Sequence, residues 1–233
     1  MEQPLQNRSI YLDRMSKPLK EKLRVTNYID TDAEYILDVG CADGAVTLAM
    51  AELFPDKRFL GIDLDGDFIE QAKSGAEKRN LNNVRFEKIY LRELLDRDER
   101  FDTVTFISVL HEFFSYGEGI SSVLKALADA EELLKPGGDI VIRDMILREY
   151  TKHTTYLTPV LLDKIRANQD IASRMDDVAQ HFGPVSTIYA INHFLLKYFY
   201  TENWPRECRE HYVPVTIEQY QQIRSEERRV GKE

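Results

Sequence analysis

The chain has 233 residues, of which 43% are hydrophobic and 30% are charged, and its formal net charge is -9. One domain of this size can bury a core. The acidic balance argues against a broad basic surface for nucleic acid, although a local basic patch is compatible with it. No apolar run reaches the roughly 20 residues of a membrane helix, and the first residues lack a signal-peptide pattern, so we expect a cytoplasmic protein. Two cysteines are too few for a disulfide framework.

Residues 8–29 carry apolar side chains at close to helical spacing, which predicts one or two short helices. Residues 35–39 are apolar apart from Asp38, as in a strand that is buried on both faces of a parallel sheet. Gly40 and Gly44 bracket a loop, and the residues that follow predict a helix. Such a unit of strand, loop and helix brings backbone N–H groups and a helix N-terminus close to a ligand.

The loop sequence indicates which ligand this unit binds. The dinucleotide fingerprint G-x-G-x-x-G would place a pyrophosphate on the helix end. This chain has Ala42 at the middle glycine position and Asp43 where the phosphate would lie, which argues against a nicotinamide dehydrogenase. Asp38 and Asp43 suit a ligand with positive charge. S-adenosylmethionine carries an ammonium group and a sulfonium group and has no phosphate.

Strands and helices alternate after this unit, and two of the predicted strands end in charged residues, Asp63 and Arg143. Ligands of open α/β sheets bind at the carboxyl ends of the strands. The alternation predicts an α/β fold with a doubly wound, mostly parallel sheet. We expect strands at 57–63, 84–89, 102–107 and 140–143, helices at 67–79 and 120–134, and a Lys-Pro-Gly-Gly turn at 135–138.

Four motifs, in matching order and spacing, resemble those of class I S-adenosylmethionine-dependent methyltransferases. The run Leu37-Asp-Val-Gly-Cys-Ala-Asp-Gly44 resembles the first motif. The stretches 59–65, 101–112 and 134–144 resemble the second strand, the fourth strand with its following loop, and the turn with the fifth strand. The resemblance covers residues 33–146. It implies a Rossmann-like fold, S-adenosylmethionine as cofactor and methyl transfer as the reaction.

The resemblance also implies which residues bind the cofactor, with Asp63 holding the ribose hydroxyls. After the third strand many relatives carry an acid and a small residue that bind the adenine amino group, whereas this chain has Tyr90 and Leu91. Tyr90 could stack on the adenine or hydrogen-bond to it. A packing role is favoured for Cys41 over a nucleophilic one, because no histidine is adjacent. The implied cofactor-binding residues are Asp38, Gly40, Cys41, Ala42, Asp43, Gly44, Asp63, Leu64, Tyr90, Leu91 and Ser108.

We expect a loop at Ser108–Phe114, which faces the sulfonium in relatives, so the acceptor would meet the methyl group there. It lacks the Asn/Asp-Pro-Pro-aromatic motif of enzymes that methylate amino groups of nucleic-acid bases, and it lacks a Pro-Cys nucleophile. His111 and Glu112 remain, and a histidine that titrates near neutral pH can remove a proton from an attacking oxygen or nitrogen. Asp144 is a third catalytic candidate. The alternatives are a structural or cofactor-positioning role for His111 and an ion pair between Arg143 and Asp144.

Residues 145–212 depart from the family motifs and are rich in histidine and aromatic side chains, as a selective acceptor pocket requires. We expect a helix that begins at Thr158-Pro159, with Thr158 as its cap and Pro159 in its first turn. Further helices are expected at 171–182, 187–201, 205–212 and 215–223. Packing in a core is the alternative role of the aromatic residues. The histidines lack zinc-ligand spacing, so no metal site is predicted. The candidate substrate contacts are Tyr11, Arg143, His193, Tyr198, Trp204 and Glu207.

We expect one methyltransferase domain over residues 1–223. It would consist of an N-terminal helical lid (1–30), a cofactor-binding core (31–146) and a helical acceptor region (147–223). In relatives such a lid often covers the cofactor, which makes Tyr11, Arg14 and Met15 lid candidates. The mostly charged residues 224–233 predict a disordered or non-native tail, and the terminal β-hairpin of the fold has no apolar counterpart here.

The sequence predicts methyl transfer from S-adenosylmethionine to an oxygen or nitrogen of a small molecule. An RNA methyltransferase is the alternative within the enzymes, with Arg148, Lys152 and Lys164 as basic residues that would contact RNA. A non-catalytic cofactor-binding or interaction protein is the alternative from another class. Neither DNA nor a membrane is expected as a partner, and the acceptor and the oligomeric state stay open.

Overall fold

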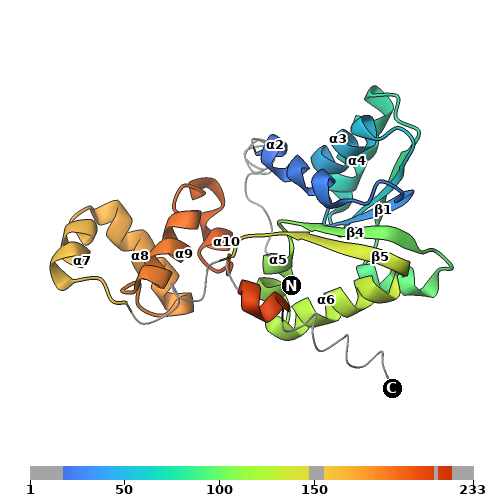
Figure 1. Cartoon of the computed structure of the whole chain (residues 1–233). Coiled ribbons are helices and arrows are strands. Elements are labelled where there is room, and N and C mark those ends of the chain that lie inside the picture. Colours follow the sequence, from blue (N-terminus) through green and yellow to red (C-terminus); the bar gives the residue numbers. More distant parts are fainter. Residues whose placement is uncertain (1–17, 147–154, 213–214, 222–233) are drawn as a thin grey trace, which may run out of the picture. The chain divides into compact units, whose positions relative to one another are not determined.

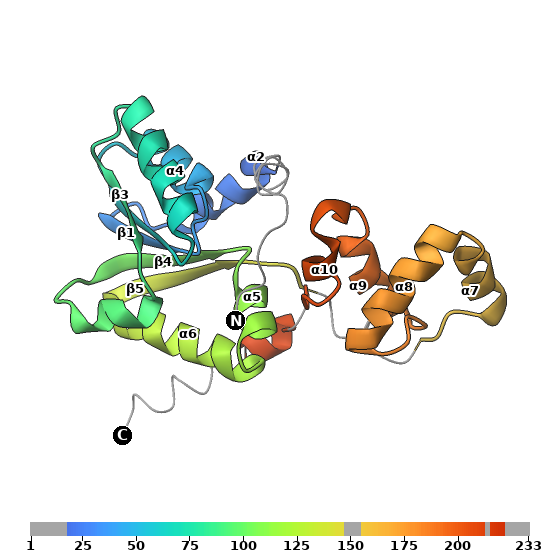
Figure 2. The same ribbon diagram turned by 180° about the vertical axis from the view of Figure 1, so that it is seen from behind.

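The computed structural model describes residues 18–146, 155–212 and 215–221. Their contacts divide them into two compact units (Figures 1 and 2). The sheet unit lies within residues 12–110 and 122–144, and the described residues of the helical unit lie within 111–121 and from 145 onward. Each unit is described by itself below. The organisation as a single domain over 1–223 stays a prediction.

The sheet unit contains a parallel five-stranded sheet with the order β3-β2-β1-β4-β5. The order reverses between β1 and β4, which confirms the doubly wound fold predicted from the sequence. The ends of β2, β3 and β4 lie within one residue of the predicted ones. The strands are β1 Tyr35–Val39, β2 Arg58–Asp63, β3 Val84–Lys88, β4 Phe101–Ile107 and β5 Leu134–Arg143.

Helices cover both faces of this sheet. In Figure 1, α3 (Ala45–Leu53) and α4 (Gly66–Lys78) lie on one face and α6 (Ile120–Glu132) lies on the other. The buried residues of α4 recur every three or four positions, as on the inner face of an amphipathic helix. A parallel sheet covered in this way needs strands that are apolar on both faces, and all five residues of β1 are buried.

The core beside β1 includes side chains from the segment that precedes the sheet. Val25 and Ile29 are buried in one cluster with Ile36, Met50 and Phe59. Burial of such side chains contributes about 1.5–3 kcal/mol each. The chain before β1 is therefore part of the folded sheet unit.

The described part of the expected N-terminal lid consists of α2 (Leu19–Lys22) and the 3-10 helix η1 (Leu23–Tyr28). These are short helices, as the apolar spacing predicted. The lid candidates Tyr11, Arg14 and Met15 lie outside the described residues. The lid function of residues 1–30 stays a prediction.

β5 begins earlier than predicted, because the Lys-Pro-Gly-Gly segment is a bulge within the strand and not a turn before it. The pairing register of β4 and β5 shifts between Phe101 and Thr103, and residues 135–138 form the bulge opposite this point. Pro136 has no N–H to donate to a ladder, and Gly137 has a φ of +84° that a regular strand does not adopt. The preceding helix α6 ends two residues before the predicted end.

The helical unit has its own core, to which α8 and α9 contribute, and none of the described helices is long and apolar enough to cross a membrane. Thr158 caps α7 as predicted, because its hydroxyl accepts a hydrogen bond from the N–H of Leu161 at 3.3 Å. Residues 217–221 are also helical. The other elements are α5 Leu110–Tyr116, α7 Pro159–Arg166, α8 Gln169–Phe182, α9 Ile188–Lys197, η4 Thr201–Asn203 and α10 Trp204–Glu207.

Three expectations for this part of the chain were wrong. The expected loop at 108–114 contains most of α5, because it has no proline or glycine to interrupt a helix. α9 ends at Lys197 and not at residue 201, because the N–H of Tyr200 donates to the carbonyl of Lys197, three residues back and not four. α10 is a single turn and does not reach residue 212, because the N–H groups of Arg209 and Glu210 donate to carbonyls three residues back and not four.

Candidate functional site

The carboxyl ends of the parallel strands form one edge of the sheet unit. β1 runs into the loop 40–44, β2 ends at Asp63, β4 is followed by Ser108, and β5 ends at Arg143. Open α/β sheets bind ligands outside this edge, at the point where the strand order reverses. The sequence-predicted cofactor residues therefore gather at the edge where a ligand of this fold would bind.

The loop after β1 has a backbone conformation that favours glycine. Gly40, Ala42 and Gly44 all have positive φ values, of 71°, 47° and 76°. A Cβ atom on Gly40 would lie 2.4 Å from Cγ2 of Val109, and one on Gly44 would lie 2.8 Å from Cβ of Ala72. Both glycines are needed for conformation and for close packing. The N–H groups of Gly40 and Cys41 donate to the carbonyl of Ile62, which holds the loop against the end of β2.

Asp63 is held by the backbone of two segments. Its Oδ2 accepts a hydrogen bond from the N–H of Ala42 at 2.8 Å, and its Oδ1 accepts one from the N–H of Asp65 at 2.9 Å. Burial raises the pKa of this carboxyl, although the backbone hydrogen bonds favour its charged form. The bond to Ala42 fixes the glycine loop next to the end of β2, so the loop and the carboxylate are positioned together.

Asp38 lies inside the sheet unit and not on its surface. It is 2% exposed, and its two carboxylate oxygens accept hydrogen bonds from the hydroxyls of Thr47 at 2.6 Å and Thr105 at 2.9 Å. Burial raises its pKa to about 6, against the effect of these two bonds. Asp38 therefore ties β1 to α3 and β4, and direct contact with a cofactor stays a prediction.

The other candidates at this edge differ in exposure. Cys41 and Leu91 are buried, and burial raises the pKa of the Cys41 thiol well above its usual range, as expected for a packing residue and not for a nucleophile. Leu64 is 39% exposed and Tyr90 is 60% exposed. Asp43 accepts a hydrogen bond at 3.2 Å from the first N–H of α3.

Ser108 and Arg143 join the ends of β4 and β5. Ser108 has a left-handed backbone with a φ of 58°. Its N–H donates to the carbonyl of Arg143 at 2.7 Å, and its hydroxyl accepts a hydrogen bond from the Arg143 guanidinium. These bonds offset the strain of a non-glycine residue in this conformation. Asp144 follows directly and is half-buried, and its catalytic role stays a prediction.

In the helical unit, a network of buried polar side chains links α5 to the chain at α10. Nε2 of His111 lies 3.1 Å from Oε1 of Glu210, and the Tyr116 hydroxyl donates to Oε2 of Glu210 at 3.1 Å. Arg206 donates to the Tyr116 hydroxyl at 2.8 Å and pairs with Glu112 at 3.0 Å. Sequence reasoning found His111 and Glu112. It missed Arg206 and Glu210, because their spacing carries no motif.

The same network contains three residues of types that can bind a metal ion. Ligand atoms of His111, Glu112 and Glu210 lie within 4.8 Å of one another. The buried guanidinium of Arg206 already lies 3.0 Å from Glu112 and 3.7 Å from Glu210. It supplies positive charge to both carboxylates and would repel a divalent cation. We therefore assign no metal to this group.

His193 and Glu207, two of the predicted substrate contacts, are each 2% exposed. His193 accepts a hydrogen bond from the backbone N–H of Tyr212 at 3.2 Å, and Glu207 accepts one from the Tyr212 hydroxyl. Burial lowers the pKa of His193 to about 2 and raises that of Glu207 to about 7. Both side chains belong to the interior of the helical unit, and a contact with substrate stays a prediction.

Tyr198 and Trp204, the two aromatic substrate candidates of this region, share one partner. The guanidinium of Arg174 lies 5.2 Å from the ring centre of Tyr198 and 5.3 Å from that of Trp204. The indole N–H of Trp204 donates to Asp177 at 2.8 Å. These contacts give both rings a packing role. The remaining candidate, Tyr11, lies outside the described residues.

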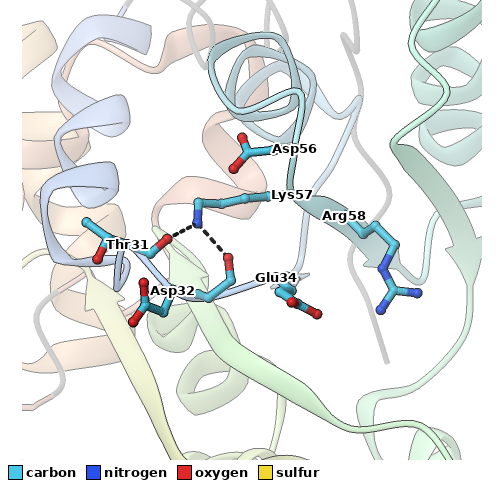
Figure 3. Close-up of a pocket in the computed structure, with 7 residues that line it drawn as sticks. Thr31, Asp32, Glu34, Asp56, Lys57 and Arg58 are labelled. Atoms are coloured by element: carbon cyan, nitrogen blue, oxygen red, sulfur yellow. Dashed lines mark hydrogen bonds between the residues drawn. The ribbon is translucent and has the colours of Figure 1, made fainter.

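A hollow of about 490 Å³ lies at the opposite edge of the sheet unit (Figure 3). Its lining comes from the segments that lead into β1 and β2, and includes Asp32 and Glu34. Lys57 closes one side, with its ammonium donating to the carbonyls of Thr31 and Ala33 at 2.6 Å each. Because the amino ends of strands form this edge, we do not assign the hollow to the cofactor.

The strand order, the glycine loop after β1 and the fixed carboxylate at the end of β2 define the class of S-adenosylmethionine-dependent methyltransferases with a Rossmann-like fold. Comparison with known proteins gives the family. Residues 30–195 match the model of a methyltransferase domain family, so the chain belongs to it. The cofactor of this family is S-adenosylmethionine.

Relatives and solved structures agree with this assignment. A probable methyltransferase, ltbC, of Aspergillus luteorubrus is 31% identical over 50% of this chain and 42% of its own length. A tRNA (guanine-N(7)-)-methyltransferase of Bacteroides thetaiotaomicron is 24% identical over 76% of this chain and 66% of its own. The crystal structure of YcgJ from Bacillus subtilis, at 19% identity, has the same fold, with a TM-score of 0.52 over 89% of this chain and 67% of that one. This chain spans less than half the length of ltbC.

Proposed function

We propose that this chain binds S-adenosylmethionine at the carboxyl edge of the sheet unit and transfers the methyl group to an oxygen or nitrogen of a small molecule. One observation carries the proposal. The carboxylate of Asp63 stands at the end of β2 and is fixed beside the glycine loop by the N–H of Ala42. A carboxylate can accept hydrogen bonds from two vicinal hydroxyls, so Asp63 would hold the ribose.

The other candidates belong to segments at the same carboxyl edge of the sheet unit. Gly40 and Gly44 keep the loop next to the end of β2, where the methionine part of the cofactor would lie, and Asp43 offers a carboxylate to its ammonium group. The exposed side chains of Leu64 and Tyr90 offer apolar surface to adenine. The remaining candidates support this edge from within or flank it, namely Asp38, Cys41, Ala42, Leu91 and Ser108.

Methyl transfer requires little of the protein beyond positioning the cofactor and the acceptor, because the sulfonium is already activated. The acceptor atom forms its bond to the methyl carbon as the bond from that carbon to sulfur breaks, and S-adenosylhomocysteine leaves. The acceptor's proton passes to a base, for which we propose His111, in the first turn of α5. Glu112 and Asp144 are further candidates for contact with the acceptor.

Charge supports a small molecule over RNA as the acceptor. The formal net charge of -9 opposes binding to a polyanion. Of the three basic residues considered for RNA contact, Lys164 lies in the last turn of α7, and Arg148 and Lys152 fall outside the described residues. Similarity to a tRNA methyltransferase keeps RNA as the alternative to be tested.

Calorimetric titration with S-adenosylmethionine and S-adenosylhomocysteine tests the cofactor site. For the wild type we expect dissociation constants on the order of micromolar. Asp63→Ala should lose binding. The control Asp67→Ala, which removes an exposed acid of the same region, should leave binding unchanged. Unaltered affinity in a folded Asp63→Ala protein, or no binding by the folded wild type, would overturn the proposal.

Release of S-adenosylhomocysteine tests the acceptor class. Phenols, alcohols and amines form one panel, and total RNA at low salt forms a second. Turnover with the first panel supports the proposal, and turnover with RNA alone supports the alternative. Cofactor binding without turnover in either panel would favour a non-catalytic cofactor-binding protein.

A further inference from the structure

Ser108 and Arg143 form a polar pair at the carboxyl edge of the sheet, and both residues belong to the sheet unit. Arg143 is the last residue of β5 and pairs in register with Ile107, the last residue of β4. Its guanidinium donates to the hydroxyl of Ser108, one residue beyond β4. The guanidinium therefore lies at the edge of the sheet where ligands of this fold bind.

Arg143 follows the last apolar layer of the core on one face of the sheet. Side chains two positions apart on a strand share a face, and so do register partners, so Arg143 leaves β5 on the face of Val141 and Ile107. These two residues are buried in one cluster with Ile36 and Met50, whereas Arg143 is half-buried. An arginine in such a place can cover the end of the core with its aliphatic stem and keep its charge at the edge.

The pair has hydrogen-bond donors that its neighbours do not use. In the part of the chain that the structure describes, the Ser108 hydroxyl is the side-chain partner of the guanidinium, and no carboxylate, that of Asp144 included, forms an ion pair with Arg143. The O–H of Ser108 likewise has no acceptor among these residues. A guanidinium has five N–H donors and a serine hydroxyl has one. Both side chains can therefore donate to a ligand, and the positive charge of Arg143 is not balanced by a described acid.

The charge of the candidate side chains differs along this edge. At the ends of β1 and β2 they include the carboxylates of Asp43 and Asp63, whereas at the end of β5 there is a cation. β4 separates β1 from β5. Neighbouring strands lie about 4.8 Å apart, so the ends of β1 and β5 are about 10 Å apart. A small molecule is long enough to extend from a cofactor at the glycine loop to Arg143.

We propose that Arg143 and Ser108 bind an anionic group of the methyl acceptor, a carboxylate or a phosphate, and that this contact selects the acceptor. The inference rests on the proposed function, which puts methyl transfer at the same edge. The planar guanidinium matches the paired oxygens of a carboxylate or a phosphate, and the Ser108 hydroxyl adds a further donor. The acceptor then carries its hydroxyl or amine group within about 10 Å of an anionic group.

Calorimetry of the protein saturated with S-adenosylhomocysteine tests the anion site without turnover. Benzoate and inorganic phosphate are the probes at low salt, and they distinguish a carboxylate from a phosphate as the preferred group. For the wild type we expect binding of at least one probe with a dissociation constant on the order of millimolar. Arg143→Met should lose this binding, and Arg143→Lys, which keeps the charge but not the planar donors, should weaken it.

The matched control is Arg58→Met, which removes an exposed arginine at the start of β2, on the opposite edge of the sheet, and should leave probe binding unchanged. Binding of neither probe by the wild type would overturn the proposal without any variant, and so would unchanged binding in a folded Arg143→Met protein. The carboxylate of the cofactor is the competing anion. Weaker binding of S-adenosylmethionine in Arg143→Met would assign Arg143 to the cofactor and would also overturn the proposal.

Paired acceptors give a second readout, in which one compound of each pair carries the anionic group. Hydroxybenzoate is compared with its methyl ester, and phosphoethanolamine with ethanolamine. We expect the wild type to favour an anionic compound by about 10- to 100-fold in kcat/KM, through a lower KM, and Arg143→Met to lose this preference. Equal kcat/KM within both pairs would contradict the proposal. If the wild type binds the cofactor but methylates no acceptor, the proposed function fails, while calorimetry still decides whether Arg143 binds an anion.

Discussion

The hydroxyl of Thr47 donates a hydrogen bond of 2.6 Å to the carboxylate of Asp38, and this contact ties α3 to β1 beneath the glycine loop. Thr105 of β4 donates to the other carboxylate oxygen. Both carboxylate oxygens of Asp38 therefore have hydrogen-bond donors. The group is also deeply buried, so the fold favours its protonated form. The stability of the sheet unit should therefore depend on the charge of Asp38.

We expect Asp38→Asn to change how stability depends on pH. The pKa of Asp38 rises from 3.8 to about 6 on folding, so between these values the folded protein binds the proton more tightly than the unfolded chain does. The contribution of Asp38 to the free energy of unfolding is then greatest below pH 3.8 and falls by about 3 kcal/mol as pH rises to 6. Urea unfolding from pH 4 to pH 7 should show the variant gaining stability relative to the wild type as pH rises. A difference that is constant with pH would contradict this account.

The contribution of His193 to the free energy of unfolding should depend on pH in the opposite direction. Its pKa falls from 6.5 to about 2 on folding, so the unfolded chain binds the proton more tightly between these values. The full contribution of His193 to the free energy of unfolding is present above pH 6.5. Below that pH it falls by about 1.4 kcal/mol for each pH unit of acidification. His193→Gln keeps an acceptor for the N–H of Tyr212 and does not titrate. We expect it to be less acid-sensitive than the wild type in urea unfolding at pH 7.5 and 5.5, whereas the exposed-site control His181→Gln should retain most of the wild-type sensitivity.

Gly40→Ala should cost more stability than Gly137→Ala. Both glycines have positive φ values, but a Cβ on Gly40 would lie 2.4 Å from Val109, and one on Gly137 would meet nothing within 4 Å. The conformational cost alone is about 1–2 kcal/mol, and the steric overlap at Gly40 adds about 1–3 kcal/mol. Chemical denaturation of the two variants measures the difference. Equal costs would show that Val109 moves aside freely.

Lys57→Met should lower stability without weakening cofactor binding. The ammonium of Lys57 is the donor to the carbonyls of Thr31 and Ala33, and its loss should cost about 1–3 kcal/mol for each acceptor left unsatisfied. These groups lie at the amino ends of the strands, so binding of S-adenosylmethionine should be unchanged in calorimetry. Arg58→Met, which removes an exposed cation from the face of Tyr35, is the control and should cost about 0.5–1 kcal/mol. Loss of cofactor binding in a folded Lys57→Met protein would connect the hollow of Figure 3 to the cofactor site.

The fold was predictable because its signals are local. The apolar run of β1, the glycines of the following loop and the acid at the end of β2 are each visible within a few residues of sequence. Their parallel arrangement follows from the alternation of strands and helices. The bulge in β5 was misread as a turn, because Pro136 and Gly137 fit either element.

The candidate site was predictable only in part. Gathering of the strand-end residues at one edge follows from the fold class, but the inward orientation of Asp38 depends on Thr47 and Thr105, which have no motif of their own. Pairing of His111 with Glu210 was not visible at all, because it joins elements far apart in the chain. Periodicity and motif spacing report neighbours along the chain, and contacts of this kind require the folded backbone.

Because the chain is synthesised from its N-terminus, the pairing of His111 with Glu210 can form only late in synthesis. All described residues of the sheet unit lie before residue 145, so this unit can fold while later segments are still being made. α5 is different, because Ser115 accepts a hydrogen bond from the N–H of His211, 96 positions further on. Its polar face can be covered only after that distant segment has left the ribosome. On a nascent chain we therefore expect the sheet unit to fold first, with His111 and Glu112 remaining open to solvent until translation has passed residue 211.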